Sequence, residues 1–184
     1  MVHFDASSAE CFVFTTKEGF LSVVAHDLKI RVTTFAIDVE ETTRAVTARF
    51  DAGSLRVVCA MEDVKEVPQS LTAANKREIE GNIVRDVLHA REYPQIRFVS
   101  TAVEEKGDAY VVKGKLALHN HERQVRVQVH KEGDRYVAET RLHQPDFGIR
   151  PYTALFGTLK VQADVTVRVV VPAAPPKPQR SPQR

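Results

Sequence analysis

Two histidines stand two residues apart in the segment 119–122, which reads HNHE. On an extended strand both imidazoles would share one face, and imidazole is a common ligand for zinc, iron and copper. The same alternation, however, places His119 on the face of Lys115, whereas Leu116 and Leu118 lie on the opposite, apolar face. We therefore interpret His119 and His121 as turn or surface residues and expect neither a metal nor a cofactor, with a metal-dependent barrel enzyme as the alternative.

Other signals of catalysis are weak. The tripeptide 146–148 reads DFG, as in protein kinases, but the chain has neither a glycine-rich phosphate loop nor an H-R-D motif. The neighbours His26 and Asp27 would point to opposite faces of a strand, so we interpret them as a structural turn. Nucleophile elbows and C-x-x-C pairs are absent from the sequence. We expect a protein that is not an enzyme.

The dominant pattern is alternation of apolar and polar residues, which is typical of strands with one dry and one wet face. A slip of this alternation at Thr33-Thr34 indicates a β-bulge or bend. Short turn signals separate the runs, which favours a meandering antiparallel sheet. We predict an all-β fold in which eight strands close into a barrel, with a flat sandwich as the alternative. The runs cover residues 12–14, 28–39, 46–52, 96–102, 110–118, 125–129, 136–142 and 159–169.

One segment has helical spacing instead. Apolar residues in 72–88 recur at intervals of three and four, and Ser70 or Thr72 is suited to cap the start. Gly81 lies within this helix and lowers its intrinsic stability, so the helix is expected to depend on packing on or over the barrel. Pro94 prevents its continuation.

Composition and charge describe a soluble domain with a tail. A content of 43% hydrophobic and 27% charged residues excludes collagen-like, coiled-coil and wholly disordered chains. Lys and Arg number 26 against 24 Asp and Glu; the tail 172–184 holds three of the basic residues and no acid, which leaves 23 basic residues for 1–171. We predict a folded domain over 1–171, a disordered proline-rich basic tail over 172–184, and no nucleic-acid binding.

The ends and the cysteines bear on location. The first residues include acids and no apolar run, and no stretch of the chain reaches the length of a membrane-spanning helix. We therefore expect the protein in the cytoplasm. Cys11 and Cys59 are interpreted as two buried thiols, with one disulfide as the alternative.

Small residues in the middle of strands point to space inside the barrel. Ala48, Gly114, Ala138 and Ala163 alternate with large apolar residues on the predicted dry faces. A solid barrel core would favour bulky branched side chains throughout. The volume left is either an apolar cavity or is filled by the helix and loops.

Three segments carry a resemblance to a known family. Residues 88–100 (LHAREYPQIRFVS) resemble the "L…yP-x-I-x-F-x-S" segment of the YceI-like family. Residues 112–127 resemble its "v-x-G-x-L-t-L-h-G" strand pair, and 146–149 resemble its D-F-G-I element. The order and separation of these segments make the resemblance specific, and it covers roughly residues 10–171.

The resemblance implies a lipocalin-like eight-stranded barrel with a helical insertion that binds polyisoprenoid chains, including isoprenoid quinones or their precursors. We accordingly expect this protein to bind a polyisoprenoid, isoprenoid-quinone or fatty-acyl chain for sequestration, storage or transport. A non-ligand-binding assembly module with a filled barrel is a further alternative. The expected partners are the lipid ligand, a membrane in transient contact and a second copy of the chain. The segment 59–71 departs from the family pattern and is expected to shape the cavity mouth.

The dry faces of the predicted strands give the candidate site. His143, Arg150 and Tyr152 flank the D-F-G-I element and are assigned to the cavity mouth. The cavity itself is assigned to Phe14, Phe35, Ile37, Ala48, Phe50, Ile96, Phe98, Leu116, Leu118, Val127, Leu142, Phe147, Val161, Ala163 and Val165.

Overall fold

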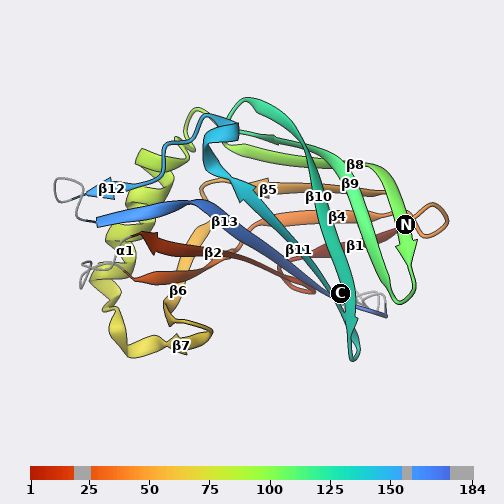
Figure 1. Ribbon diagram of the computed structural model, residues 1–184, viewed down its shortest axis with the longest axis horizontal. Helices are drawn as coiled ribbons and strands as arrows, with labels where there is room; N and C mark the ends of the chain where they lie inside the picture. The colour runs from red at the N-terminus through yellow and green to blue at the C-terminus, as the bar shows by residue number, and fades with distance from the viewer. Residues whose placement is uncertain (19–25, 155–158, 175–184) are drawn as a thin grey trace, which may run out of the picture.

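A single antiparallel sheet makes up most of the computed structural model, which describes residues 1–18, 26–154 and 159–174 (Figure 1). Within these residues the sheet has thirteen strands rather than eight. They are β1 (Val2–Asp5), β2 (Glu10–Glu18), β3 (Asp27–Val32), β4 (Phe35–Val39), β5 (Val46–Asp51), β6 (Leu55–Glu62), β7 (Lys65–Val67), β8 (Gln95–Lys106), β9 (Ala109–Leu118), β10 (His121–Glu132), β11 (Arg135–His143), β12 (Thr153–Ala154) and β13 (Leu159–Pro172).

The difference in strand number arises because three long runs bend and are divided in two, and because the short strands β7 and β12 add to the eight runs. β1 continues into β2, β3 into β4 and β5 into β6, and each half pairs with a different neighbour on one side. The pairing can be followed around the barrel. β13 pairs with β2, and β1, the other half of that run, pairs with β4. β4 pairs with β5 and β5 with β8, and β9, β10 and β11 then complete the circuit back to β13. Eight continuous stretches therefore surround one interior, and the predicted lipocalin-like barrel is confirmed.

The bend between β3 and β4 lies at Thr33-Thr34, where the sequence pattern slips. The Thr33 amide donates to the Ser54 carbonyl at 3.0 Å, and the Asp51 amide donates to the Thr34 carbonyl at 3.0 Å. The facing bend between β5 and β6 includes Ser54, whose buried hydroxyl donates to the Asp51 carbonyl at 2.8 Å. These bonds satisfy backbone groups that the bends remove from regular pairing.

The predicted helix is present as α1 (Ala73–Asn82), followed by a π-helical turn, η2 (Ile83–Val87). Thr72 caps the helix, because its hydroxyl accepts from the Asn75 amide and its own amide donates to the Asn75 side-chain oxygen. Ser70 lies in the preceding 3-10 turn, η1 (Pro68–Ser70). Two side chains anchor α1 to β6, because Lys76 Nζ donates to the Val58 carbonyl at 2.6 Å and Glu80 accepts from the Val57 amide at 2.8 Å. The helix lies beside one end of the barrel (Figure 1).

Replacing Gly81 with alanine is expected to stabilise the protein by up to about 1 kcal/mol. An added Cβ meets only the end of the flexible Arg85 side chain, at 3.7 Å. Alanine restricts the unfolded chain and suits a helix, so the melting temperature should rise by a few degrees. Thermal unfolding measures this, and a lower melting temperature would contradict the open space at Gly81.

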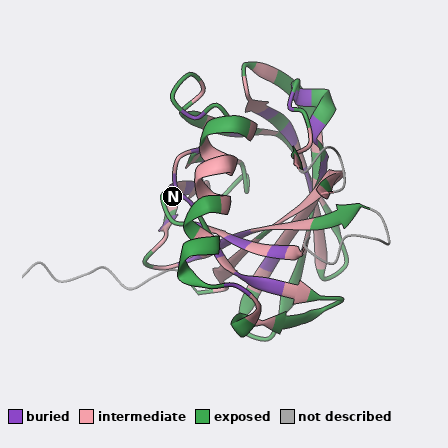
Figure 2. Cartoon of the chain, turned by 90° about the vertical axis from the view of Figure 1, so that its left-hand side faces the viewer, coloured by how far each residue is buried: buried purple, intermediate pink, exposed green. Residues whose placement is uncertain are grey.

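Burial alternates along several strands, as on β3, and Figure 2 shows buried and more exposed residues following one another along the strands. Cys11 and Cys59 are each 1% exposed and unbridged, which confirms the expectation of two buried thiols.

β13 continues to Pro172, which pairs with Arg135, so ordered pairing extends one residue beyond the predicted boundary. The rest of the predicted tail, from residue 175, lies outside the described residues. None of the helices in the described segments is long and apolar enough to cross a membrane.

Candidate ligand-binding cavity

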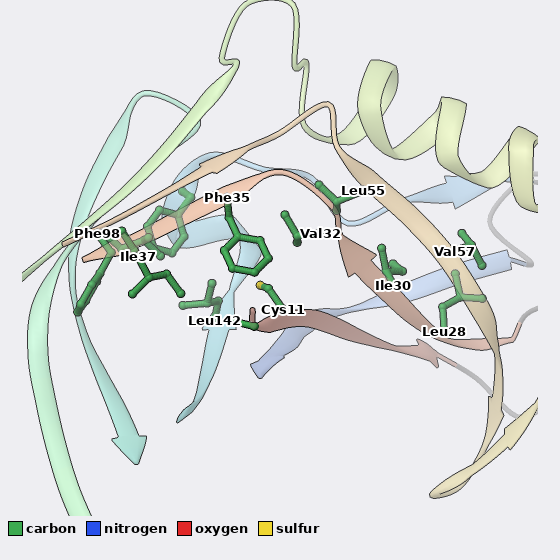
Figure 3. Packing of buried hydrophobic residues seen from close by; sticks show 14 of the residues in the cluster. Cys11, Leu28, Ile30, Val32, Phe35, Ile37, Leu55, Val57, Phe98 and Leu142 are labelled. Carbon is green, nitrogen blue, oxygen red and sulfur yellow. The ribbon is translucent and has the colours of Figure 1, made fainter. Parts of the chain in front are cut away.

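The barrel interior contains a cavity of about 800 Å³. This volume lies within the range of sites that hold one small organic ligand. On β13 its wall extends from Leu159 to Val171, a strand length of roughly 35–40 Å. The cavity is therefore long, and its side chains come from nearly every strand of the barrel and from α1. Figure 3 shows some of these side chains, including Cys11 from β2 and Leu28 and Ile30 from β3.

Most of the residues assigned to the cavity from the sequence line it. They share the inward phase of their strands or, for Phe147, a place in the 3-10 turn η3 (Gln144–Phe147). Tyr152, assigned to the mouth, also lines the cavity. The lining members of the predicted cavity set are Ile37, Ala48, Phe50, Ile96, Phe98, Leu116, Leu118, Val127, Leu142, Phe147, Val161 and Val165.

Phe14 does not line the cavity, so its assignment is wrong. The inward residues of β2 are the odd-numbered ones, including Val13 and Thr15. Phe14 lies on the opposite face, where its ring packs 6.4 Å from that of Phe12 and 5.7 Å from the Arg168 guanidinium. A cation over an aromatic face stabilises such an outward ring, and it explains how large apolar residues occupy the outer phase of this strand.

Ala163 and Phe35 are also absent from the cavity wall. β13 shifts register against β2 between Val161 and Val165, so residues 162–164 lie opposite a single residue of β2. This irregularity breaks the alternation that placed Ala163 inward. Phe35 is buried in the packed core instead, with its ring 6.0 Å from that of Phe50 (Figure 3).

His143 and Arg150 are exposed and lie away from the cavity, which corrects their assignment to the mouth. His143 Nδ1 bonds to Asp164 at 2.7 Å on the outer face. This bond, together with the Arg141 guanidinium, lowers the pKa of Asp164. His143 alternates with the inward Leu142 at the end of β11, and Arg150 lies in the irregular segment between η3 and β12.

Two groups of lining residues were not predicted from the sequence. One group has the same inward alternation as the assigned residues and was open to the same reasoning, for example Leu28, Ile30, Val167 and Val169. The other belongs to the helix, where Asn75, Glu78, Ile79, Asn82 and Ile83 face the cavity. Helical periodicity identifies an apolar stripe but does not identify the polar residues beside it.

The small residues of the strands differ in what they contribute. Ala48 and Ala138 lie at the cavity wall. Gly114 does not leave open volume, because a Cβ at this position would lie 2.5 Å from the Phe98 ring and 2.6 Å from the Val99 carbonyl. The Phe98 side chain thus occupies the space above Gly114.

Among the described residues, the acidic and basic side chains that line the cavity lie at one end. Lys17, His26 and Glu78 lie at the end beside α1, where β2 ends and β3 begins (Figure 1). His26, interpreted as part of a turn, therefore lines the mouth, while Asp27 accepts from the Lys17 amide at 2.7 Å. The predicted insertion 59–71 reaches the same end through Ser70 and Leu71.

The interior wall carries no formal charge among the lining residues of the described segments. Cys11 lines it, and burial raises the pKa of its thiol to about 12, so the sulfur stays protonated at neutral pH. An apolar chain fits this interior without desolvating an ion, whereas a charged group is accommodated only at the α1 end.

His119 and Asn120 form the β9–β10 turn, both with positive φ. The turn expected at His119 is confirmed, but its ring is not a free surface group. His119 Nδ1 donates to the Phe147 carbonyl at 3.2 Å, and its ring lies 4.3 Å from Tyr93 and 6.4 Å from His121. The hairpin tip thereby packs against η3, and in the described segments no group of three or more His, Cys, Asp or Glu is arranged to hold a metal.

Stability is expected to fall as the pH is lowered below the ordinary histidine pKa of 6.5, in part because of His119. Burial of the ring lowers the pKa of His119, and its Nε2 is buried without a hydrogen-bond partner among the described residues. The unfolded chain therefore takes up this proton more readily than the folded one, so acid favours unfolding.

His119→Asn should reduce this pH dependence, since asparagine tolerates the positive φ. Melting temperatures of both proteins at pH 7.5 and 5.5 measure the effect, and the parent should lose a few degrees more than the variant. Equal losses would contradict a role for His119.

Comparison with known proteins is consistent with this architecture. A family model for the YceI-like domain matches residues 4–173. No curated protein sequence matches the chain. Solved structures do: that of Burkholderia cenocepacia BcnA has a TM-score of 0.65 and 16% identity, covering 95% of this chain and 100% of its own. A Campylobacter jejuni YceI protein has a TM-score of 0.56 and 13% identity, covering 88% and 91%.

Proposed function

Since the chain belongs to the YceI-like family, we propose that its barrel binds one long apolar chain, such as a polyisoprenoid, an isoprenoid quinone or a fatty acyl chain, for sequestration, storage or transport. The observation that carries this proposal is the long cavity of about 800 Å³ with an uncharged, largely apolar interior. A filled barrel acting only as an assembly module would leave this cavity without a role.

Transfer from water supplies the affinity. Each CH₂ group moved into an apolar interior contributes about 0.8 kcal/mol, so burial of ~12 groups contributes roughly 10 kcal/mol. Loss of rigid-body freedom and ordering of the chain oppose binding by several kcal/mol. The net affinity is then micromolar or somewhat tighter. The protein acts by partition, as a binding protein and not as an enzyme.

The chain is expected to enter with its apolar end first and to keep its polar end near α1. Lys17, His26 and Glu78 offer polar surroundings at that end, and the far end is lined by apolar residues such as Val39, Val46 and Val171. The Asn82 amide donates to the Tyr152 hydroxyl at 3.0 Å, which joins α1 to the segment before β12 across the rim. Entry beside or beneath α1 therefore requires small displacements at the rim and leaves the barrel strands in place.

Extraction of the purified protein with organic solvent, followed by mass spectrometry, tests the proposal. The expected result is a chain lipid in near-stoichiometric amount, or, from protein stripped of lipid, saturable uptake of the neutral fluorescent probe N-phenyl-1-naphthylamine. Protein that yields no lipid and takes up no probe would overturn the proposal.

Location and partners remain part of the proposal. A cytoplasmic protein in transient contact with membranes, alone or as a homodimer, would exchange such a ligand with a bilayer. Cell fractionation and sedimentation with and without vesicles test these points.

A further inference from the structure

Three histidine rings gather where the β9–β10 turn, the start of β10 and the segment after η2 meet. Between ring centroids, His119 lies 5.5 Å from His89 and 6.4 Å from His121, and Tyr93 packs on it at 4.3 Å. The His121 ring in turn lies against Gly148 at the end of η3, where an added Cβ would be 2.6 Å from it. These three histidines, called the histidine cluster below, therefore hold the hairpin tip against two other segments.

The histidine cluster lies directly behind part of the cavity wall, where Leu88, Leu118 and Phe147 line the interior. Leu88 directly precedes His89 and ends the helical segment that α1 and η2 form at the cavity mouth. In the same way Leu118 precedes His119, whose Nδ1 donates to the Phe147 carbonyl at 3.2 Å. A displacement of the clustered rings therefore moves the wall and the end of the helical segment together.

The closed arrangement leaves no place for a second proton on His119. Because its Nδ1 donates to Phe147, its Nε2 is the nitrogen that acid protonates, and this Nε2 is buried without a hydrogen-bond partner among the described residues. Burial lowers the pKa of His119, the bond to Phe147 and the charge of Glu92 raise it, and His89 and His121 lower it further. A buried N–H⁺ without an acceptor is costly, so protonation favours an arrangement in which the ring reaches water.

The acids around the cluster do not form ion pairs with it. Within the described segments, the histidines paired with acids are His3, His130 and His143. Glu122 pairs with Lys115 instead. Protonated rings in the cluster therefore repel one another without a bonded counter-charge. The other titratable and charged side chains on the surrounding elements are Arg91, Glu92 and Tyr93 before β8, Glu122 on β10 and Asp146 in η3.

We propose that the histidine cluster is a pH-sensitive catch, which at neutral pH holds the helical segment and the cavity wall closed and which acid opens to release the bound chain. This inference rests on the proposed function and names a regulation of the same cavity. The closed form retains the chain and excludes the proton, so the bound chain and the proton oppose each other. A histidine with the ordinary pKa of 6.5 changes from about one-tenth to about nine-tenths protonated between pH 7.5 and 5.5. The open form therefore gains up to about tenfold in population.

Release of the neutral probe N-phenyl-1-naphthylamine from loaded protein into phosphatidylcholine vesicles tests the catch. The parent should release the probe about 3- to 10-fold faster at pH 5.5 than at pH 7.5. His119→Asn, which tolerates the positive φ and does not titrate, should reduce this ratio to below about 2-fold. His130→Asn is the matched control, since His130 is exposed on β10 and bonds to Glu132 at 2.7 Å, and it should keep the parent's ratio. Each ratio compares one protein at two pH values, so a uniform change in stability cancels.

A second measurement needs no variant. Titration of the histidine ring protons by NMR should show that excess probe shifts the titration of His119 to lower pH and leaves that of His130 in place. Equal acceleration of release in the parent and His119→Asn, loss of the pH dependence in His130→Asn as well, or a titration of His119 that the probe does not move would overturn the inference, while the proposed function stands. A parent protein that takes up no probe would overturn the proposed function and the inference with it.

Discussion

Ala138→Phe is expected to fold normally and to lose uptake of apolar ligands, with affinity reduced at least tenfold. Ala138 lies on the cavity wall of β11, between Val129 of β10 and Val169 of β13. A phenyl ring placed there enters the cavity and occupies the volume needed by the chain. Because the ring enters open space, the overpacking cost of about 1–3 kcal/mol that applies to a filled core is largely avoided.

Probe titration and thermal unfolding of the ligand-free protein measure the two effects separately. Ala163→Phe is the matched control, since Ala163 lies in the irregular segment of β13 and away from the cavity wall. This control should retain uptake. Undiminished uptake by Ala138→Phe, or loss of uptake in both variants, would contradict the position of the binding volume.

Gly114→Ala is expected to destabilise the protein by about 1–3 kcal/mol, or roughly 2–12 °C in melting temperature. The new Cβ would lie 2.6 Å from the Val99 carbonyl oxygen, which belongs to the backbone of β8, and 2.5 Å from the Phe98 ring. A side chain can rotate away, but moving the carbonyl requires displacing β8 from β9. Circular dichroism during heating measures the shift.

Gly81→Ala provides the control for this substitution, since it makes the same chemical change where space is open. The two variants should shift the melting temperature in opposite directions. A Gly114→Ala protein as stable as the parent would show that β8 and β9 separate easily at this point.

The barrel was predictable from sequence because its strands alternate cleanly over most of their length. β13 alternates from Leu159 to Val169, and its inward residues Val165 and Val167 line the cavity as the pattern indicates. The same rule failed where a strand is apolar on both faces. On β2 the outward Phe12 and Phe14 are more apolar than the inward Thr15 and Lys17, so hydrophobicity alone selected the wrong phase.

The remaining errors come from features that alternation does not encode. The irregularity of β13 moved Ala163 off the cavity wall, and Arg150 lies in the segment after η3, outside any strand. The outward side of His143, by contrast, follows from alternation with the inward Leu142 on β11. The polar face of α1 entered the site through tertiary contacts, such as the bond between Asn82 and Tyr152. Such contacts join residues distant in sequence, and a single sequence contains no signal of their pairing.

The pairing of β13 with β2 has a consequence for biosynthesis. It joins Glu10 to Val170, so β2 has its first neighbour, β3, early in synthesis but gains its second neighbour, β13, only when nearly all of this sequence has been made. At about 5–20 residues per second, translation leaves this edge of β2 open for roughly 8–30 s. Such long-range pairing also slows folding. An open edge can add a strand from another chain, and charged side chains oppose such pairing, so Glu10, Lys17 and Glu18 along β2 are expected to protect this edge until β13 is made.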